Sequence, residues 1–292
     1  MIHLACLLAL RAWSLLATVA FVEDNSIFEE FMTRGVQLNG VTVRLPAPTL
    51  ADGLSASEQQ AALASIADTN HPVSALVRNA VVAPLVLKIE DEPNKGAVRP
   101  RRVDLWFVVY GDIEKLGDED FLIKQANEEA RADGQQFSQE GHILTADELR
   151  TRSISMNSGE RYLAGRFTLF DRVQVSGTMR TKLTRTAESV TTAGRLDPRF
   201  DQKVEFPNVW RSITRDAEGR ASLGRPQSYR GVGWFAKATK LADPAGAILI
   251  EVHAVFDEPA EWFNGANLLR SKLPIVLQDK VRAVRRRLAS AR

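Results

Sequence analysis

One strand-like stretch of the 292-residue chain, ILIEVHAVFDE (248–258), places an acid and an imidazole two residues apart. In a β-strand, the side chains of Glu251 and His253 leave the same face, about 7 Å apart. A carboxylate beside an imidazole can orient a general base, so one interpretation of this polar pair is an unmarked hydrolase. The interpretation that we favour is a structural pair on the polar face of a sheet that is half exposed to water.

The sequence contains no other pattern that is typical of catalysis or of cofactor binding. GxGxxG, P-loop, HExxH, GxSxG and EF-hand patterns are all missing. A metal site built on Glu251 and His253 would need a third ligand, and no spacing indicates one. We therefore expect no catalytic residue, no metal and no cofactor, and the sequence favours a protein that is not an enzyme.

Glu251 and His253 need a sheet to hold them, and the sequence predicts an antiparallel one. In RVQVSGTMRTKL (172–183), small or apolar residues alternate with polar ones, so one face is expected to be buried and the other wet. A high content of β-branched and aromatic residues predicts the other strands. They cover residues 83–92, 101–111, 203–213, 228–240 and 247–256.

The C-terminal segment holds the most concentrated charge and predicts a long amphipathic helix. Its apolar stripe consists of Leu273, Leu277, Val281, Val284 and Leu288, and Pro274 suits a first helical turn. The other surface of this helix carries four candidate contacts to an anionic surface, which are Arg282, Arg285, Arg286 and Arg287. The alternative is that these arginines are solvated or pair with the mildly acidic remainder of the chain.

Residues 1–20, MIHLACLLALRAWSLLATVA, are expected to be a cleaved signal peptide for export, because an apolar run closes with small residues. Arg11 interrupts that run, so an uncleaved membrane anchor and a cytosolic amphipathic start remain alternatives. The single cysteine, Cys6, lies inside this segment. A cleaved chain would therefore have no thiol for a disulfide or a metal site.

Residues 21–95 predict a small subregion of helices and a hairpin. It comprises a helix over 26–34, a hairpin at Asn39 and Gly40, a helix capped by Ser55 and Glu58, and a short helix after Pro72. Residues 96–292 are expected to add helices at 118–130 and 146–150, the antiparallel sheet and the C-terminal helix. We expect the two parts to form one compact unit.

The order of these elements resembles the helix-grip fold of the START and Bet v 1-like superfamily. The resemblance is carried by VDLWFVVYG (103–111) as first strand, helices within 118–150, strands from 160 to 256 and a helix from 274 to 290. It includes no functional motif. It implies an α+β fold in which a curved antiparallel sheet wraps the C-terminal helix, with a cavity for an apolar ligand between them. Large side chains such as Trp106, Trp234 and Phe256 favour a solid core instead.

The overall charge limits the partners. A net charge of +2 does not indicate a general polyanion binder, and export argues against nucleic acid. We expect an exported, non-enzymatic binding protein with an apolar small molecule as its partner. The alternative is a structural or interaction protein of the cell envelope that applies its basic helix to an anionic surface. The sequence does not determine the oligomeric state.

Overall fold

The computed structural model describes residues 24–38, 40–92, 98–117, 140–201, 205–263 and 267–290. These residues form an α+β protein in which a large antiparallel sheet packs against the C-terminal helix α7 (Leu268–Ser290), so the predicted fold class is confirmed. The sheet contains strands β3 (Val86–Asp91), β4 (Val98–Tyr110), β5 (Glu140–Ile143), β6 (Glu160–Leu169), β7 (Val173–Arg185), β8 (Ser189–Leu196), β9 (Val209–Arg215), β10 (Ala221–Leu223), β11 (Gln227–Ser228), β12 (Val232–Lys240) and β13 (Ala247–Pro259).

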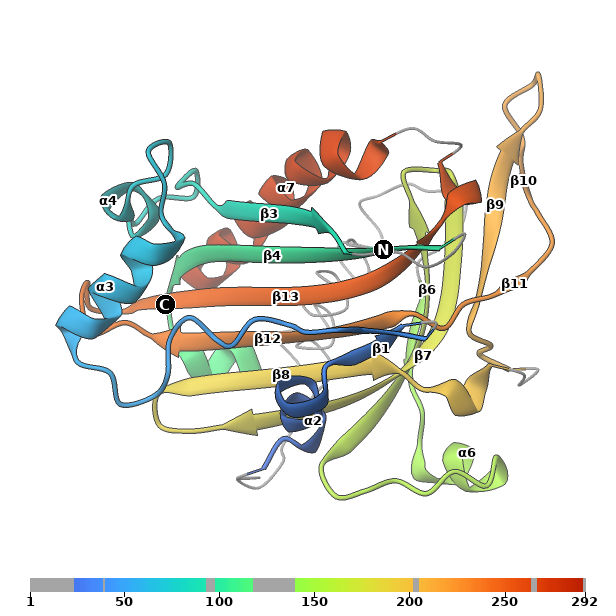
Figure 1. Ribbon diagram of the computed structural model, residues 1–292, viewed down its shortest axis with the longest axis horizontal. Coiled ribbons are helices and arrows are strands. Elements are labelled where there is room, and N and C mark those ends of the chain that lie inside the picture. Colours follow the sequence, from blue (N-terminus) through green and yellow to red (C-terminus); the bar gives the residue numbers. More distant parts are fainter. Residues whose placement is uncertain are drawn as a thin grey trace.

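The strands follow the order β10-β9-β7-β8-β12-β13-β4-β3, with β6 on the other edge of β7, β5 beside β6, and β11 beside β9. Strand β7 makes the corner of this sheet, because Val173–Ser176 pair with β9 whereas Met179–Arg185 pair with β8 along the same edge. Gly177 lies between the two segments, and a Cβ there would meet Leu196 Cδ2 at 2.6 Å. Figure 1 shows β6 and β7 curving away from β12, β13 and β4, which run side by side.

The cross-strand register defines an inner and an outer face of the central sheet. Ile250, Val252 and Ala254 of β13 belong to the inner core with the apolar stripe of α7, every member of which is buried as predicted. Glu251 and His253 alternate with them and therefore lie on the outer face. The large side chains of Trp234 and Phe256 are buried in the inner core, whereas Trp106 lies on the outer face.

Helix α7 begins earlier than the sequence indicated. It starts at Leu268, and Pro274 lies inside it rather than in its first turn, so that part of the prediction is wrong. Leu269 and Leu273 are four residues apart and both are buried, so the additional turn extends the apolar stripe. Burial of this extra residue offsets the backbone hydrogen bond that the proline cannot donate.

The N-terminal subregion covers the outer face of the sheet. It contains α2 (Ser26–Arg34), the hairpin of β1 (Val36–Leu38) and β2 (Val41–Val43), α3 (Ala56–Ile66) and α4 (Val73–Leu76). The predicted capping box of Ser55 and Glu58 is present. Figure 1 shows α2 and β1 in front of the central strands, while α7 passes behind them.

The expectation of a wet outer face is wrong, because this covering buries it. Phe31 and Leu38 pack on Phe235 of β12 in one cluster, and Leu63 packs with Trp106 in a second. Even the polar side of β7 is covered, since Thr178 and Lys182 are buried. Alternating polarity indicates which face of a strand is more polar, but it does not show whether another segment of the chain covers that face.

The remaining elements are short. They are α6 (Ala146–Thr151) and the 3₁₀ turns η2 (Ile113–Gly117), η3 (Pro198–Phe200) and η4 (Ala260–Trp262). Helix α6 agrees with the prediction for 146–150 and has a capping box of Thr145 and Glu148. The helix predicted at 118–130 lies outside the described residues. The strand predicted at 203–213 is displaced to Val209–Arg215.

Candidate functional site

The predicted polar pair is part of a buried trio, defined here as Asp104, Glu251 and His253. His253 Nδ1 lies 2.7 Å from Asp104 Oδ1, and its Nε2 lies 3.1 Å from Glu251 Oε2. Asp104 is opposite His253 in the register of β4 and β13, so the sheet itself brings the two together. The sequence contained a signal for Asp104 that we did not use, because it is an acid inside the otherwise apolar run VDLWFVV.

The electrostatics of the trio favour an imidazolium between two carboxylates. Burial lowers the pKa of His253, but hydrogen bonds and attraction from Asp104 and Glu251 outweigh it, so the pKa is raised above its usual value. The rings of Phe235 and Trp106 enclose the imidazole at centroid distances of 4.7 and 5.2 Å. The three side chains are thereby buried together, and Arg102 Nε lies 3.2 Å from the other oxygen of Asp104, Oδ2.

A short segment of the N-terminal subregion seals the trio, and we call residues 49–53 the strap. Thr49 donates its backbone N–H to Glu251 Oε2 at 2.8 Å and accepts a hydrogen bond from the Trp106 indole on its hydroxyl at 2.8 Å. Lys237 of β12 donates to the Leu50 carbonyl at 2.8 Å and pairs with Asp52 at the same distance. The strap therefore crosses three strands of the outer face and is fastened to each.

This arrangement argues against hydrolysis at Glu251 and His253. The imidazole is 0% exposed, and each of its nitrogens is engaged by a carboxylate. A general base needs a free nitrogen within hydrogen-bond reach of a substrate proton. In the buried arrangement His253 offers none, and Glu251 bonds the Thr49 amide of the strap instead.

The four arginines of α7 have different environments. Arg285 is only 6% exposed, and its guanidinium donates to the carbonyls of Val108, Val81, Ala83 and Pro84. Burial, with a smaller effect of nearby Arg282, lowers its pKa to about 10. Its proposed role at an anionic surface is therefore corrected, because this side chain ties α7 to the sheet. Arg286 is exposed, and Arg282 and Arg287 are half-buried.

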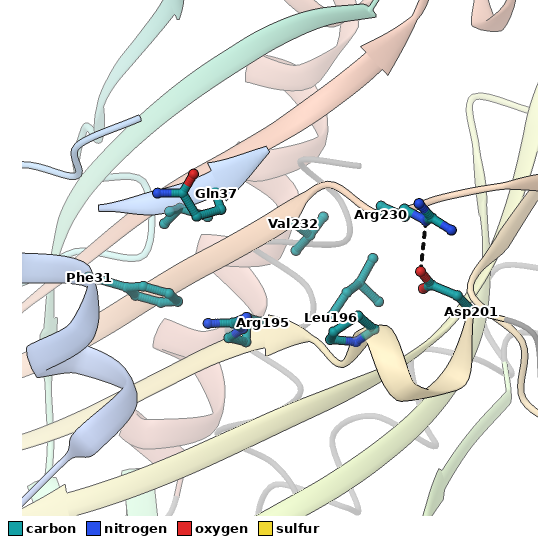
Figure 2. Close-up of a pocket in the computed structure, with 9 residues that line it drawn as sticks. Phe31, Gln37, Arg195, Leu196, Asp201, Arg230 and Val232 are labelled. Carbon is teal, nitrogen blue, oxygen red and sulfur yellow. Dashed lines mark ion pairs between the residues drawn. The ribbon is translucent and has the colours of Figure 1, made fainter. Parts of the chain in front are cut away.

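A pocket of about 290 Å³ opens where the N-terminal subregion meets the sheet. Its apolar walls come from Phe31, Val36, Leu196, Pro198 and Val232, and its polar groups from Gln37, Arg195, Asp201 and Arg230. Figure 2 shows these side chains arriving from α2, β1, the end of β8, η3 and the start of β12. Sequence reasoning missed this site because residues from such distant segments share no local pattern.

Both arginines of the pocket already have a carboxylate partner. Arg195 Nη1 lies 2.6 Å from Glu30 Oε1, and Arg230 Nε lies 2.7 Å from Asp201 Oδ2, the pair drawn dashed in Figure 2. Each of these contacts uses one nitrogen of the guanidinium. Since a guanidinium carries five N–H donors in a fixed fork, further donors remain for another acceptor.

The inner core also contains polar atoms without a partner. Among the described residues, Thr192 Oγ1, Trp234 Nε1 and Trp262 Nε1 are buried and form no hydrogen bond. An unpaired buried donor costs about 1–3 kcal/mol, so a water or a polar group of a ligand would stabilise this region. Trp234 and Trp262 belong to the core between the sheet and α7.

Two further searches of the described residues are negative. Those residues contain no group of three or more His, Cys, Asp or Glu side chains that could hold a metal ion. No helix among them combines the length and the apolar character that crossing a membrane requires.

Fold and sites thus define an α+β protein with a sheet enclosed between a C-terminal helix and an N-terminal covering. No protein-family model and no curated protein matches the chain. It is similar to the structure of human STARD10, at 8% identity over 67% of this chain and 73% of that one, with a TM-score of 0.34.

Two bacterial structures are similar as well. The Mll3558 protein from Rhizobium loti is 9% identical over 66% of this chain and 99% of its own, with a TM-score of 0.30. An uncharacterised protein from Rhizobium leguminosarum is 8% identical over 70% and 99%, with a TM-score of 0.29.

Proposed function

We propose that the protein is an exported, non-enzymatic binding protein for a small molecule with a substantial apolar part. The observation that carries this proposal is the pocket between α2, β1 and the ends of β8 and β12. Ligand sites in proteins are typically concave and mostly apolar, with a few polar groups that fix orientation. At about 290 Å³ this pocket lies just below their usual range of roughly 300–1,000 Å³, and its lining mixes apolar and polar side chains.

The buried trio supports a binding role over a catalytic one. His253, whose pKa is raised, is sealed under the strap and lies outside the pocket lining. The pocket itself joins two parts of the chain, because the N-terminal subregion supplies Phe31, Val36 and Gln37 while the sheet supplies the opposite wall. A ligand there would stabilise the folded state through contacts to both.

Export of the protein is part of this proposal and depends on residues 1–20, which lie outside the described residues. Native mass spectrometry of the full-length gene product, purified from its own host, tests both the cleavage of residues 1–20 and the binding of a small molecule. We expect a chain that begins near Phe21 and carries a small organic adduct. A chain that retains Met1 would contradict cleavage.

A variant that fills the pocket mouth tests the site. Gln37 lines the pocket and is exposed, so Gln37→Trp should remove the adduct while the fold persists. Thr33→Trp, on the exposed side of α2 and outside the lining, is the matched control and should keep it. Retention of the adduct by Gln37→Trp, or no adduct on the wild-type protein, would refute binding in this pocket.

A second function, attachment to an anionic envelope surface, is supported by the outward side of α7. Ile275 is 63% exposed, and Arg282 and Arg286 follow it by 7 and 11 residues, which places all three on one stripe of the helix. An apolar residue beside cations is typical of helices that lie on anionic lipid. Arg282→Gln with Arg286→Gln should release the protein from vesicles containing phosphatidylglycerol, whereas Arg220→Gln on a distant hairpin should not; equal retention would refute this function.

A further inference from the structure

The polar part of the pocket indicates the chemical class of its ligand, an inference that rests on the proposed function. We infer that the ligand is an amphiphilic anion, such as a small carboxylate with an apolar body, and that Arg195 binds the anionic group. The lining contains two guanidinium groups, Arg195 and Arg230, and one carboxylate, Asp201, whereas the carboxylate that pairs with Arg195 lies outside it. Phe31, Val36 and Leu196 supply apolar walls beside these charged groups.

Arg195 is better placed for this role than Arg230. Its side chain is 29% exposed, against 56% for Arg230, so an ion pair at Arg195 is less screened by solvent. Arg230 also pairs with Asp201, a lining carboxylate that would repel an anion. Glu30, the partner of Arg195, lies outside the pocket lining.

A glycine on the neighbouring strand β12 allows the apolar walls of the pocket to lie close to Arg195. Gly233 is the cross-strand partner of Arg195 in β12. A Cβ at Gly233 would meet Val36 Cγ1 at 2.6 Å and Phe31 Cζ at 3.3 Å, so only glycine lets α2 and β1 approach the sheet here. The result is a cation at the edge of an apolar surface, which suits a ligand with one charged end.

Glu30 can yield to an incoming anion because it has a second cation nearby. Its Oε2 lies 4.0 Å from Arg180 Nη2, while Oε1 holds Arg195. When a ligand carboxylate forms two parallel hydrogen bonds with the Arg195 fork, Glu30 can turn to Nη2 of Arg180, whose Nη1 lies 3.8 Å from Glu160. The pair of Glu30 and Arg195 thus keeps the cation compensated when no ligand is bound.

Isothermal titration of the full chain with octanoate, octanol and octylamine tests the inference. These probes share one apolar chain and differ in the charge of the head group. We expect octanoate to bind at least about tenfold more tightly than octanol, and octylamine to bind weakest. Arg195→Gln should weaken octanoate binding roughly tenfold or more and leave octanol binding unchanged.

Glu30→Gln is the matched control, because it breaks the same ion pair with α2 but keeps the guanidinium. It should preserve or tighten octanoate binding. If Glu30→Gln and Arg195→Gln weaken binding equally, Arg195 only docks α2 and the inference is wrong. Arg195→Lys, which keeps the charge but loses the fork, should give an intermediate affinity and serves if Arg195→Gln does not fold.

The possible failures separate the inference from the function on which it rests. Equal binding of octanoate and octanol, or a larger effect of Arg230→Gln than of Arg195→Gln, would overturn the role of Arg195 while leaving a ligand pocket. If none of the three probes binds and the protein purified from its host carries no adduct, the proposed binding function fails as well.

Discussion

Replacing Glu251 by glutamine should test whether the buried trio fastens the N-terminal covering to the sheet. Glu251 Oε2 accepts from the Thr49 amide at 2.8 Å and from His253 Nε2 at 3.1 Å. Glutamine has the same shape and can keep both hydrogen bonds by placing its amide oxygen at the position of Oε2, but its NH2 group then replaces the buried Oε1, which has no hydrogen-bond partner. The variant therefore removes one carboxylate charge beside His253 and adds a buried donor without a partner.

The expected cost follows from these two changes. An unpaired buried donor costs about 1–3 kcal/mol, and breaking a buried ion pair costs about 3–5 kcal/mol. Because Asp104 still neutralises His253, we expect the free energy of unfolding to fall by about 2–4 kcal/mol. At roughly 2–4 °C per kcal/mol for a chain of this size, Tm should fall by about 5–15 °C.

Urea denaturation and differential scanning calorimetry at pH 7 measure this change. Glu90→Gln is the control, because Glu90 also belongs to the sheet and pairs with Arg102 but is 49% exposed. Exposed ion pairs contribute about 0–1 kcal/mol, so this variant should differ little from the wild type. A loss below about 1 kcal/mol for Glu251→Gln, or a loss equal to that of Glu90→Gln, would refute the role assigned to the trio.

Three further predictions concern pH and the C-terminal helix. Because the pKa of His253 is raised in the folded state, its protonation stabilises that state fully below a pH of about 6.5. Urea titrations should show that this stabilisation is lost as the pH rises through the folded-state pKa. If His253→Gln shows the same pH dependence, His253 is not the group responsible. Arg285→Gln should lower the free energy of unfolding by about 2–4 kcal/mol, because it leaves backbone carbonyls unpaired. Replacing the exposed Arg286 by glutamine should change it by less than about 0.5 kcal/mol. Similar effects of the two variants in thermal unfolding would show that Arg285 does not hold α7 to the sheet. Leu277→Ala should lower the free energy of unfolding by about 2–5 kcal/mol, because Leu277 is 0% exposed. Ile275→Ala, on the opposite side of the helix, should change it little in chemical denaturation. A larger effect of Ile275→Ala would show that the other face of α7 packs on the sheet.

Local patterns in the sequence were sufficient for many of the elements. The capping box of Ser55 and Glu58, the alternation along 172–183 and the apolar stripe from Leu273 to Leu288 each involve residues within a few positions of one another. Helical and extended periodicities depend on such short spacings, so they could be predicted without a structure. The α+β class followed from the order of these elements.

The candidate sites depend on contacts that no local pattern contains. Asp104 and His253 are 149 positions apart, and the strap at Thr49 precedes Glu251 by 202. The sequence showed that Glu251 and His253 share a face, but only the folded chain decided that this face is covered, that Arg285 turns inward, and that Arg195 meets Phe31 at a pocket. Burial depends on which distant segment packs on a surface, because the alternation within a strand specifies two faces and leaves the covering of each to the rest of the molecule.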